Sequence, residues 1–208
     1  MYLPGILLAF TAFTLGIFSP GPNILAVIGT SMSVGRKSGI ALAMGVATGS
    51  FSWAILTAVG LSALLATYAS ILIFIKIAGG AYLIYLGYKS IRSALFKYDL
   101  EASPLGGGQR TKFGYYMRGY IIQMTNPKAA LTWVAIISLG LKPDAPLWVA
   151  ITIVIGTATM SVIMHYIYAV LFSTRYMVSA YSRSRRWIQG VLGMFFSVAG
   201  LKLLLSET

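Results

Sequence analysis

Lys128 is the residue whose surroundings most clearly indicate a chemical role. It lies near the middle of an apolar stretch, directly after Thr125-Asn126-Pro127. If this stretch crosses a membrane, a lone charge there is costly unless it is hydrated or paired. The four acidic residues all lie outside the apolar stretches, so we expect an anionic group on a ligand to be the counter-ion. The alternative is a structural role, in which Lys128 contacts carbonyl groups freed by Pro127.

A second cluster of helix-breaking residues, from Ser19 to Asn23, lies inside an earlier apolar stretch. Proline lacks a backbone N–H and clashes with the preceding turn, so each cluster should interrupt a helix. Asn23 and Asn126 can bind a substrate, cap the freed backbone, or do both. Two interruptions at matching places in two halves predict a transport site near the membrane midplane. Its candidate substrate-binding residues are Ser19, Pro20, Gly21, Pro22, Asn23, Asn126, Pro127 and Lys128.

Lys76 and His165 are the two remaining candidates. Lys76 lies near the expected outer end of an apolar stretch, where its side chain either lines the pathway or extends to the interface. His165 is the only histidine of the chain. A histidine can titrate near neutral pH, which makes His165 the candidate for proton coupling. The alternative for His165 is a hydrogen-bonded packing residue.

The composition predicts that helices in a membrane position these residues. Hydrophobic residues make up 58% of the chain and charged residues 10%, and the mean hydropathy is +0.81. A soluble domain carries about 25% charged residues. Six apolar stretches are each long enough to cross a bilayer, namely 3–34, 39–65, 71–95, 115–141, 147–172 and 187–205. No basic residue precedes the first and no small-residue cleavage site follows it, so we expect a retained span and not a signal peptide.

The net charge of +12 follows from basic residues that concentrate in alternate joints between these stretches. Under the positive-inside rule these joints are cytoplasmic, and both termini face the periplasm. A soluble nucleic-acid binder would need a folded basic domain, and none is predicted here. The basic joints contain Arg36 and Lys37, then Lys89, Arg92, Lys97, Arg110, Lys112 and Arg118, and finally Arg175, Arg183, Arg185 and Arg186.

The chain is expected to form one transmembrane domain, 1–208, built from two halves. A hydrophilic, glycine-rich linker, 97–113, separates a first three-helix repeat, 1–96, from a second, 114–208. Because each half has an odd number of spans, the halves form an inverted repeat. A weak internal echo supports this division: Gly80, Tyr82, Gly87 and Lys89 recur in spacing as Gly193, Phe195, Gly200 and Lys202.

Several function classes are disfavoured by the residue types present. The chain has no cysteine, so thiol redox chemistry is excluded. Paired acids, a metal-binding cluster and a phosphate loop are missing from the spans, so we expect neither an enzyme nor a bound metal or cofactor. The expected partners are membrane lipid and a small-molecule substrate, with no nucleic acid.

Taken together, the motifs resemble the LysE/RhtB family of bacterial amino-acid exporters. The resemblance covers nearly the whole chain and includes the Ser19 to Asn23 cluster and the Asn126-Pro127-Lys128-Ala129 motif. It also includes the glycines Gly39, Gly45, Gly49, Gly80 and Gly87. It implies a six-helix exporter of amino acids or close derivatives in the inner membrane, driven by the proton gradient, and it leaves a homodimer open. The two proline motifs would form its central site.

Ser50 departs from this resemblance, because many family members have an aspartate at this position, directly after the glycines of the second span. Without that carboxylate, a cationic side chain on the substrate has no opposite charge to pair with, so we expect a neutral amino acid. Proton coupling also lacks an obvious carboxylate that could carry the proton. Two other functions stay open, an inorganic-ion exporter and a membrane scaffold that transports nothing. Metal cations prefer clusters of oxygen or imidazole ligands, which weakens the ion alternative.

Overall fold

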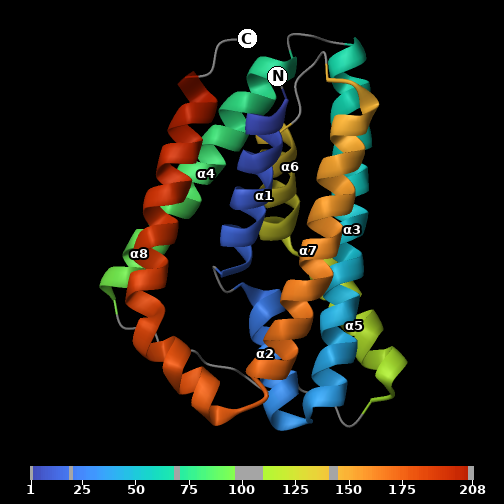
Figure 1. The fold of residues 1–208 in the computed structure, drawn as a ribbon, viewed down its shortest axis with the longest axis vertical. Coiled ribbons are helices and arrows are strands. Elements are labelled where there is room, and N and C mark those ends of the chain that lie inside the picture. The colour runs from blue at the N-terminus through green and yellow to red at the C-terminus, as the bar shows by residue number, and fades with distance from the viewer. Residues whose placement is uncertain (1, 19–20, 68–70, 97–109, 141–144, 206–208) are drawn as a thin grey trace.

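A computed structural model describes residues 2–18, 21–67, 71–96, 110–140 and 145–205 of the chain. Over these ranges the fold is all helical, and the long helices run roughly along the vertical axis of Figure 1. The described residues form the helices α1 (Leu3–Phe18), α2 (Pro22–Ser33), α3 (Arg36–Thr67), α4 (Ile71–Leu95), α5 (Lys112–Met124), α6 (Pro127–Gly140), α7 (Leu147–Leu171) and α8 (Arg175–Leu205).

The first and fourth expected spans are each divided into two helices. α1 ends at Phe18 and α2 begins at Pro22, and the axes of the two helices differ by 50°. α5 ends at Met124 and α6 begins at Pro127. Proline suits the first turn of a helix, where its missing N–H would have had no helical partner. Each proline motif therefore ends one helix and begins the next.

Three helical segments are long and apolar enough to cross a membrane by themselves, namely Arg36–Gly60, Leu147–Leu171 and Ser179–Leu205. α1 and α2 together meet the same criterion as one bent span. Up to four of the six expected spans are thus supported within the described ranges. The other two expected spans correspond to α4 and to α5 with α6, and the division into three plus three spans stays a prediction.

Glycines allow α3 and α5 to approach each other closely. A Cβ at Gly45 would overlap the carbonyl oxygen of Tyr116, and one at Gly119 would overlap that of Leu42. One helix pair thus has a glycine on each side of its contact. Gly49 also lies at this contact, because a Cβ there would lie 2.8 Å from Cβ of Gln123.

α4 and α8 form the most extensive contact between described helices and lie side by side in Figure 1. The echoed glycines meet there in a crossed arrangement. A Cβ at Gly80 would lie 3.1 Å from the carbonyl oxygen of Gly200, and a Cβ at Gly87 would lie 3.0 Å from that of Gly193. The first glycine of one echo therefore faces the second glycine of the other.

α8 begins at Arg175, twelve residues before the last expected span. The basic segment before that span is helical in the structure, whereas the sequence predicts a joint there. Two of its arginines bind the end of α4. Arg185 donates to the Ser93 hydroxyl at 2.7 Å, and Arg186 donates to the Ala94 carbonyl oxygen at 3.1 Å. These bonds hold the end of the polar segment against α4. The start of α1 and the end of α8 lie at the same end of the molecule (Figure 1).

Candidate functional site

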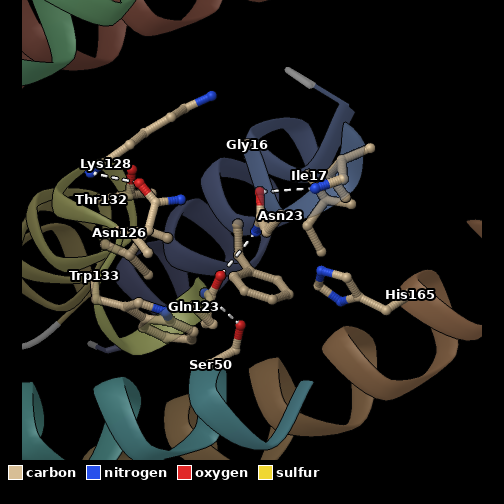
Figure 2. A pocket seen from close by; sticks show the side chains of 14 residues that line it. Gly16, Ile17, Asn23, Ser50, Gln123, Asn126, Lys128, Thr132, Trp133 and His165 are labelled. Carbon is tan, nitrogen blue, oxygen red and sulfur yellow. Dashed lines mark hydrogen bonds between the residues drawn. The ribbon is translucent and has the colours of Figure 1, made fainter. Parts of the chain in front are cut away.

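A small cavity lies inside the bundle, next to the two interrupted spans. Its volume is about 60 Å³. A buried water requires roughly 10–15 Å³ by a comparable measure, so a few waters fit. Residues of α1, α2, α3, α5, α6 and α7 line it, together with Asn126 between α5 and α6 (Figure 2). They are Phe13, Gly16, Ile17, Asn23, Ile24, Ser50, Gln123, Asn126, Lys128, Ala129, Thr132, Trp133, Ile136 and His165.

Three uncharged side chains form a hydrogen-bonded bridge across one wall of the cavity. Asn23 Nδ2 donates to Gln123 Oε1 at 2.8 Å, and Gln123 Nε2 donates to the Ser50 hydroxyl at 2.8 Å (Figure 2). The bridge thereby links α2, α5 and α3. Trp53 adds a third hydrogen bond, because its indole N–H donates to the backbone carbonyl oxygen of Gln123 at 3.2 Å.

The two asparagines of the breaks bind backbone amides in similar ways. Asn23 Oδ1 accepts from the N–H of Ile24 at 3.0 Å, and Asn126 Oδ1 accepts from the N–H of Lys128 at 3.0 Å. These bonds satisfy N–H groups in the first turns of α2 and α6, which have no helical partners. The capping role expected for both residues is therefore present, and both also line the cavity.

The side chain of Lys128 extends from the first turn of α6 to the start of α2. Lys128 is the second residue of α6 and is half-buried. A Cβ at Gly21, the residue before α2, would lie 3.5 Å from Lys128 Nζ. Each helix start carries a partial positive charge from its aligned peptide dipoles. The ammonium group and two helix starts thus concentrate positive potential beside the cavity, which favours an anion.

His165 is contributed to the cavity by α7. Its side chain is buried, and its Nδ1 lies 2.8 Å from the carbonyl oxygen of Ser161. Its Nε2 is buried and has no hydrogen-bond partner among the described residues. In Figure 2 the ring lies across the cavity from Lys128. A role as a hydrogen-bonded packing residue thus accounts for Nδ1 of His165 but does not account for Nε2.

The structure brings together four of the candidate residues, namely Asn23, Asn126, Lys128 and His165. Gly21, Pro22 and Pro127 form the helix starts beside the cavity. Ser19 and Pro20 lie outside the described residues, as does the side chain of Lys76 in α4.

Gln123, Thr132 and Trp133 also line the cavity, although none of them was a sequence candidate. Gln123 lies within a span and three residues before Asn126, and a buried polar residue so close to a break is a signal that could have identified it. Trp133, whose ring centroid lies 5.2 Å from that of Phe13, could not be told from a packing residue by sequence.

Comparison with known proteins decides the family. The sequence profile of the family described as LysE type translocator matches residues 14–207. The chain belongs to this family. The resemblance inferred from the proline motifs and glycines is therefore confirmed. LysE translocators are transporters, and this family membership supports in part the prediction that the chain is not an enzyme.

Several bacterial LysE relatives align over most of the chain. A membrane protein of Escherichia coli K12 called YahN is 28% identical over 203 residues, which cover 97% of this chain and 90% of that protein. A threonine efflux protein of Salmonella typhi is 29% identical, covering 92% of this chain and 93% of the relative. A leucine efflux protein of Enterobacter sp. strain 638 is 26% identical, covering 91% and 92%. No solved structure matches the chain significantly.

Proposed function

We propose that this LysE translocator exports a neutral amino acid across the bacterial inner membrane as a proton-coupled secondary transporter. The single observation that carries the proposal is the convergence of Lys128 and the starts of α2 and α6 on an internal cavity. An amino-acid carboxylate would complement this positive potential. In the relatives' names, the exported amino acids are threonine and leucine, which are both neutral.

The cavity lining supports a neutral substrate. The described residues around it include no carboxylate, and the position after Gly49 holds Ser50, whose hydroxyl accepts from Gln123. A cationic side chain would therefore lose its hydration without gaining an opposite charge, which is unfavourable. A neutral side chain would not incur this cost.

Alternating access is the transport mode we propose, with the two breaks as hinges. Hinges are commonly found where elements end, since a few residues there absorb the change in backbone angles. The crossed contacts of Gly80 with Gly200 and of Gly87 with Gly193 support an inverted repeat. In such repeats a rocking motion of one half against the other exposes the site alternately to each side.

The test is efflux from liposomes that contain the purified protein and one labelled amino acid at a time, with a pH gradient imposed. Lys128→Met should lower the transport of neutral amino acids about 10- to 100-fold, the loss expected for a hydrogen bond to a charged group. Lys112→Met is the matched control, because Lys112 is exposed at the start of α5. It should transport like the wild type.

Two outcomes would count against the proposal in different ways. Wild-type protein that released none of the twenty amino acids faster than protein-free liposomes would exclude the export function. Unchanged transport by Lys128→Met would leave export intact and exclude Lys128 as the carboxylate site.

A further inference from the structure

Among the described residues that line the cavity, two buried polar atoms have no hydrogen-bond partner, Nε2 of His165 and Oγ1 of Thr132. Thr132 lies on the same side of the cavity as Lys128, and His165 lies on the other side (Figure 2). The side chain of His165 is 2% exposed, and the ring lies at the cavity wall on α7. A buried polar atom without a partner destabilises the folded protein, because it has lost its hydrogen bonds to water. Such atoms are rare in folded proteins, and each calls for a physical reason.

The contact with Ser161 determines what this nitrogen can do. Nδ1 lies 2.8 Å from the carbonyl oxygen of Ser161 and 3.2 Å from the hydroxyl oxygen of the same residue. Because the carbonyl oxygen is the nearer of the two and can only accept a hydrogen bond, we assign the ring hydrogen to Nδ1. In a neutral imidazole the other nitrogen is then an acceptor. A charged ring would be costly at this buried position, where the described part of the cavity lining offers no carboxylate. Nε2 is therefore a hydrogen-bond acceptor at the cavity wall, and no donor binds it among the described residues.

An amino acid whose carboxylate lies near Lys128 would carry its donors toward this acceptor. Its ammonium group is repelled by Lys128 and by the starts of α2 and α6, so it should turn away from them. Figure 2 shows His165 on the side of the cavity away from Lys128. In the uncharged bridge, Nδ2 of Asn23 donates to Gln123 and Oδ1 of Asn23 accepts from the N–H of Ile24. Each of these atoms already has one hydrogen bond, whereas Nε2 of His165 has none among the described residues.

We propose that Nε2 of His165 accepts a hydrogen bond from an N–H or O–H donor of the exported amino acid. This inference rests on the proposed export function and deepens it. His165 then binds the substrate directly, a different use from the proton coupling considered on the sequence alone. The donor is either the ammonium group, which every amino acid has, or a side-chain hydroxyl such as that of threonine.

The first test needs no substitution, because the chain has a single histidine. Wild-type protein labelled with ¹⁵N-histidine gives signals from one ring only. Saturating L-threonine should shift the Nε2 resonance and leave that of Nδ1 nearly unchanged. Sodium acetate at the same concentration supplies a carboxylate without a donor and should leave Nε2 unshifted. An Nε2 resonance that L-threonine did not move, despite binding shown by thermal shift, would overturn the inference alone.

The second test compares His165→Leu with His165→Gln. Leucine removes the acceptor, and glutamine retains one. Binding of L-threonine, measured by thermal shift, should weaken about 10- to 100-fold in His165→Leu and largely recover in His165→Gln. Thr157→Val is the matched control, since Thr157 is buried on the same helix and does not line the cavity. It should bind like the wild type.

Two ligands distinguish the two donors. L-2-aminobutanoate has the ammonium group of threonine but lacks its hydroxyl. If it loses affinity for His165→Leu as strongly as L-threonine does, the ammonium is the donor. If only L-threonine loses affinity, the hydroxyl is the donor. A folded His165→Leu protein that bound both ligands like the wild type would overturn the inference, whereas a wild type that bound and exported no amino acid would overturn the proposed function.

Discussion

Ser50 connects the choice of substrate to the hydrogen-bonded bridge. Its hydroxyl is buried and accepts from Gln123 Nε2, so an aspartate oxygen at this position could accept the same bond. An aspartate would also place a negative charge at the cavity wall. One residue can therefore change the electrostatics of the cavity without breaking the connection between α3 and α5.

Ser50→Asp should shift the exporter toward cationic substrates. The introduced carboxylate would attract a cationic side chain and partly neutralise the potential near Lys128. We expect the ratio of L-lysine to L-leucine efflux from liposomes to rise about tenfold, which corresponds to roughly 1.4 kcal/mol.

Ser52→Asp is the control for this change. Ser52 lies on the same helix but is not part of the cavity lining. An equal shift in selectivity in both variants would mean that any negative charge on this helix suffices, and it would exclude a specific effect at Ser50.

At the scale of the elements, close contacts between helices hold the interrupted spans in place. α5 carries Gln123, and its position against α3 depends on Gly45 and Gly119. In lipid, tight packing of small residues is a main source of attraction between helices. A side chain at either glycine would separate the two backbones and stretch the hydrogen bond from Gln123 to Ser50.

Gly45→Ala should therefore destabilise the protein by roughly 1–3 kcal/mol, the usual cost of overpacking. Detergent-solubilised protein should unfold at a lower temperature, as read by tryptophan fluorescence. Gly60→Ala is the matched control on the same helix, because a Cβ there meets no atom of the described residues within 4 Å. It should unfold at the wild-type temperature or slightly above, since alanine favours a helix more than glycine does. Equal unfolding temperatures for both variants would contradict the close packing of α3 and α5.

At the scale of the whole molecule, the helices were largely predictable, and the contacts across the cavity were not. Long apolar stretches and proline motifs are local signals, so α7 and both breaks could be predicted from the sequence. The pairing of Gln123 with Asn23 joins residues a hundred positions apart, and no local pattern specifies it. The early start of α8 was missed because its stability depends on contacts with α4 that composition does not reveal.

The orientation in the membrane can be tested with single cysteines, because the natural chain has none. Lys37→Cys lies at the basic end of α3, and Leu147→Cys lies at the start of α7. Both native side chains are exposed. If the basic joints face the cytoplasm, an impermeant maleimide added to intact cells with a permeable outer membrane should label Leu147→Cys at least about tenfold faster than Lys37→Cys. Lysis should make the two rates similar, and the reverse order before lysis would invert the assigned topology.

The absence of formal charge on Asn23, Gln123 and Ser50 has an electrical consequence. A membrane potential does work of about 2.3 kcal/mol per elementary charge per 100 mV on charges that cross it. Amides and hydroxyls carry dipoles and no net charge. Breaking or forming the hydrogen bonds of the bridge therefore depends very little on the membrane potential. A dependence of turnover on voltage would then arise from the transported ions, from the substrate, or from displacement of charged side chains such as Lys128.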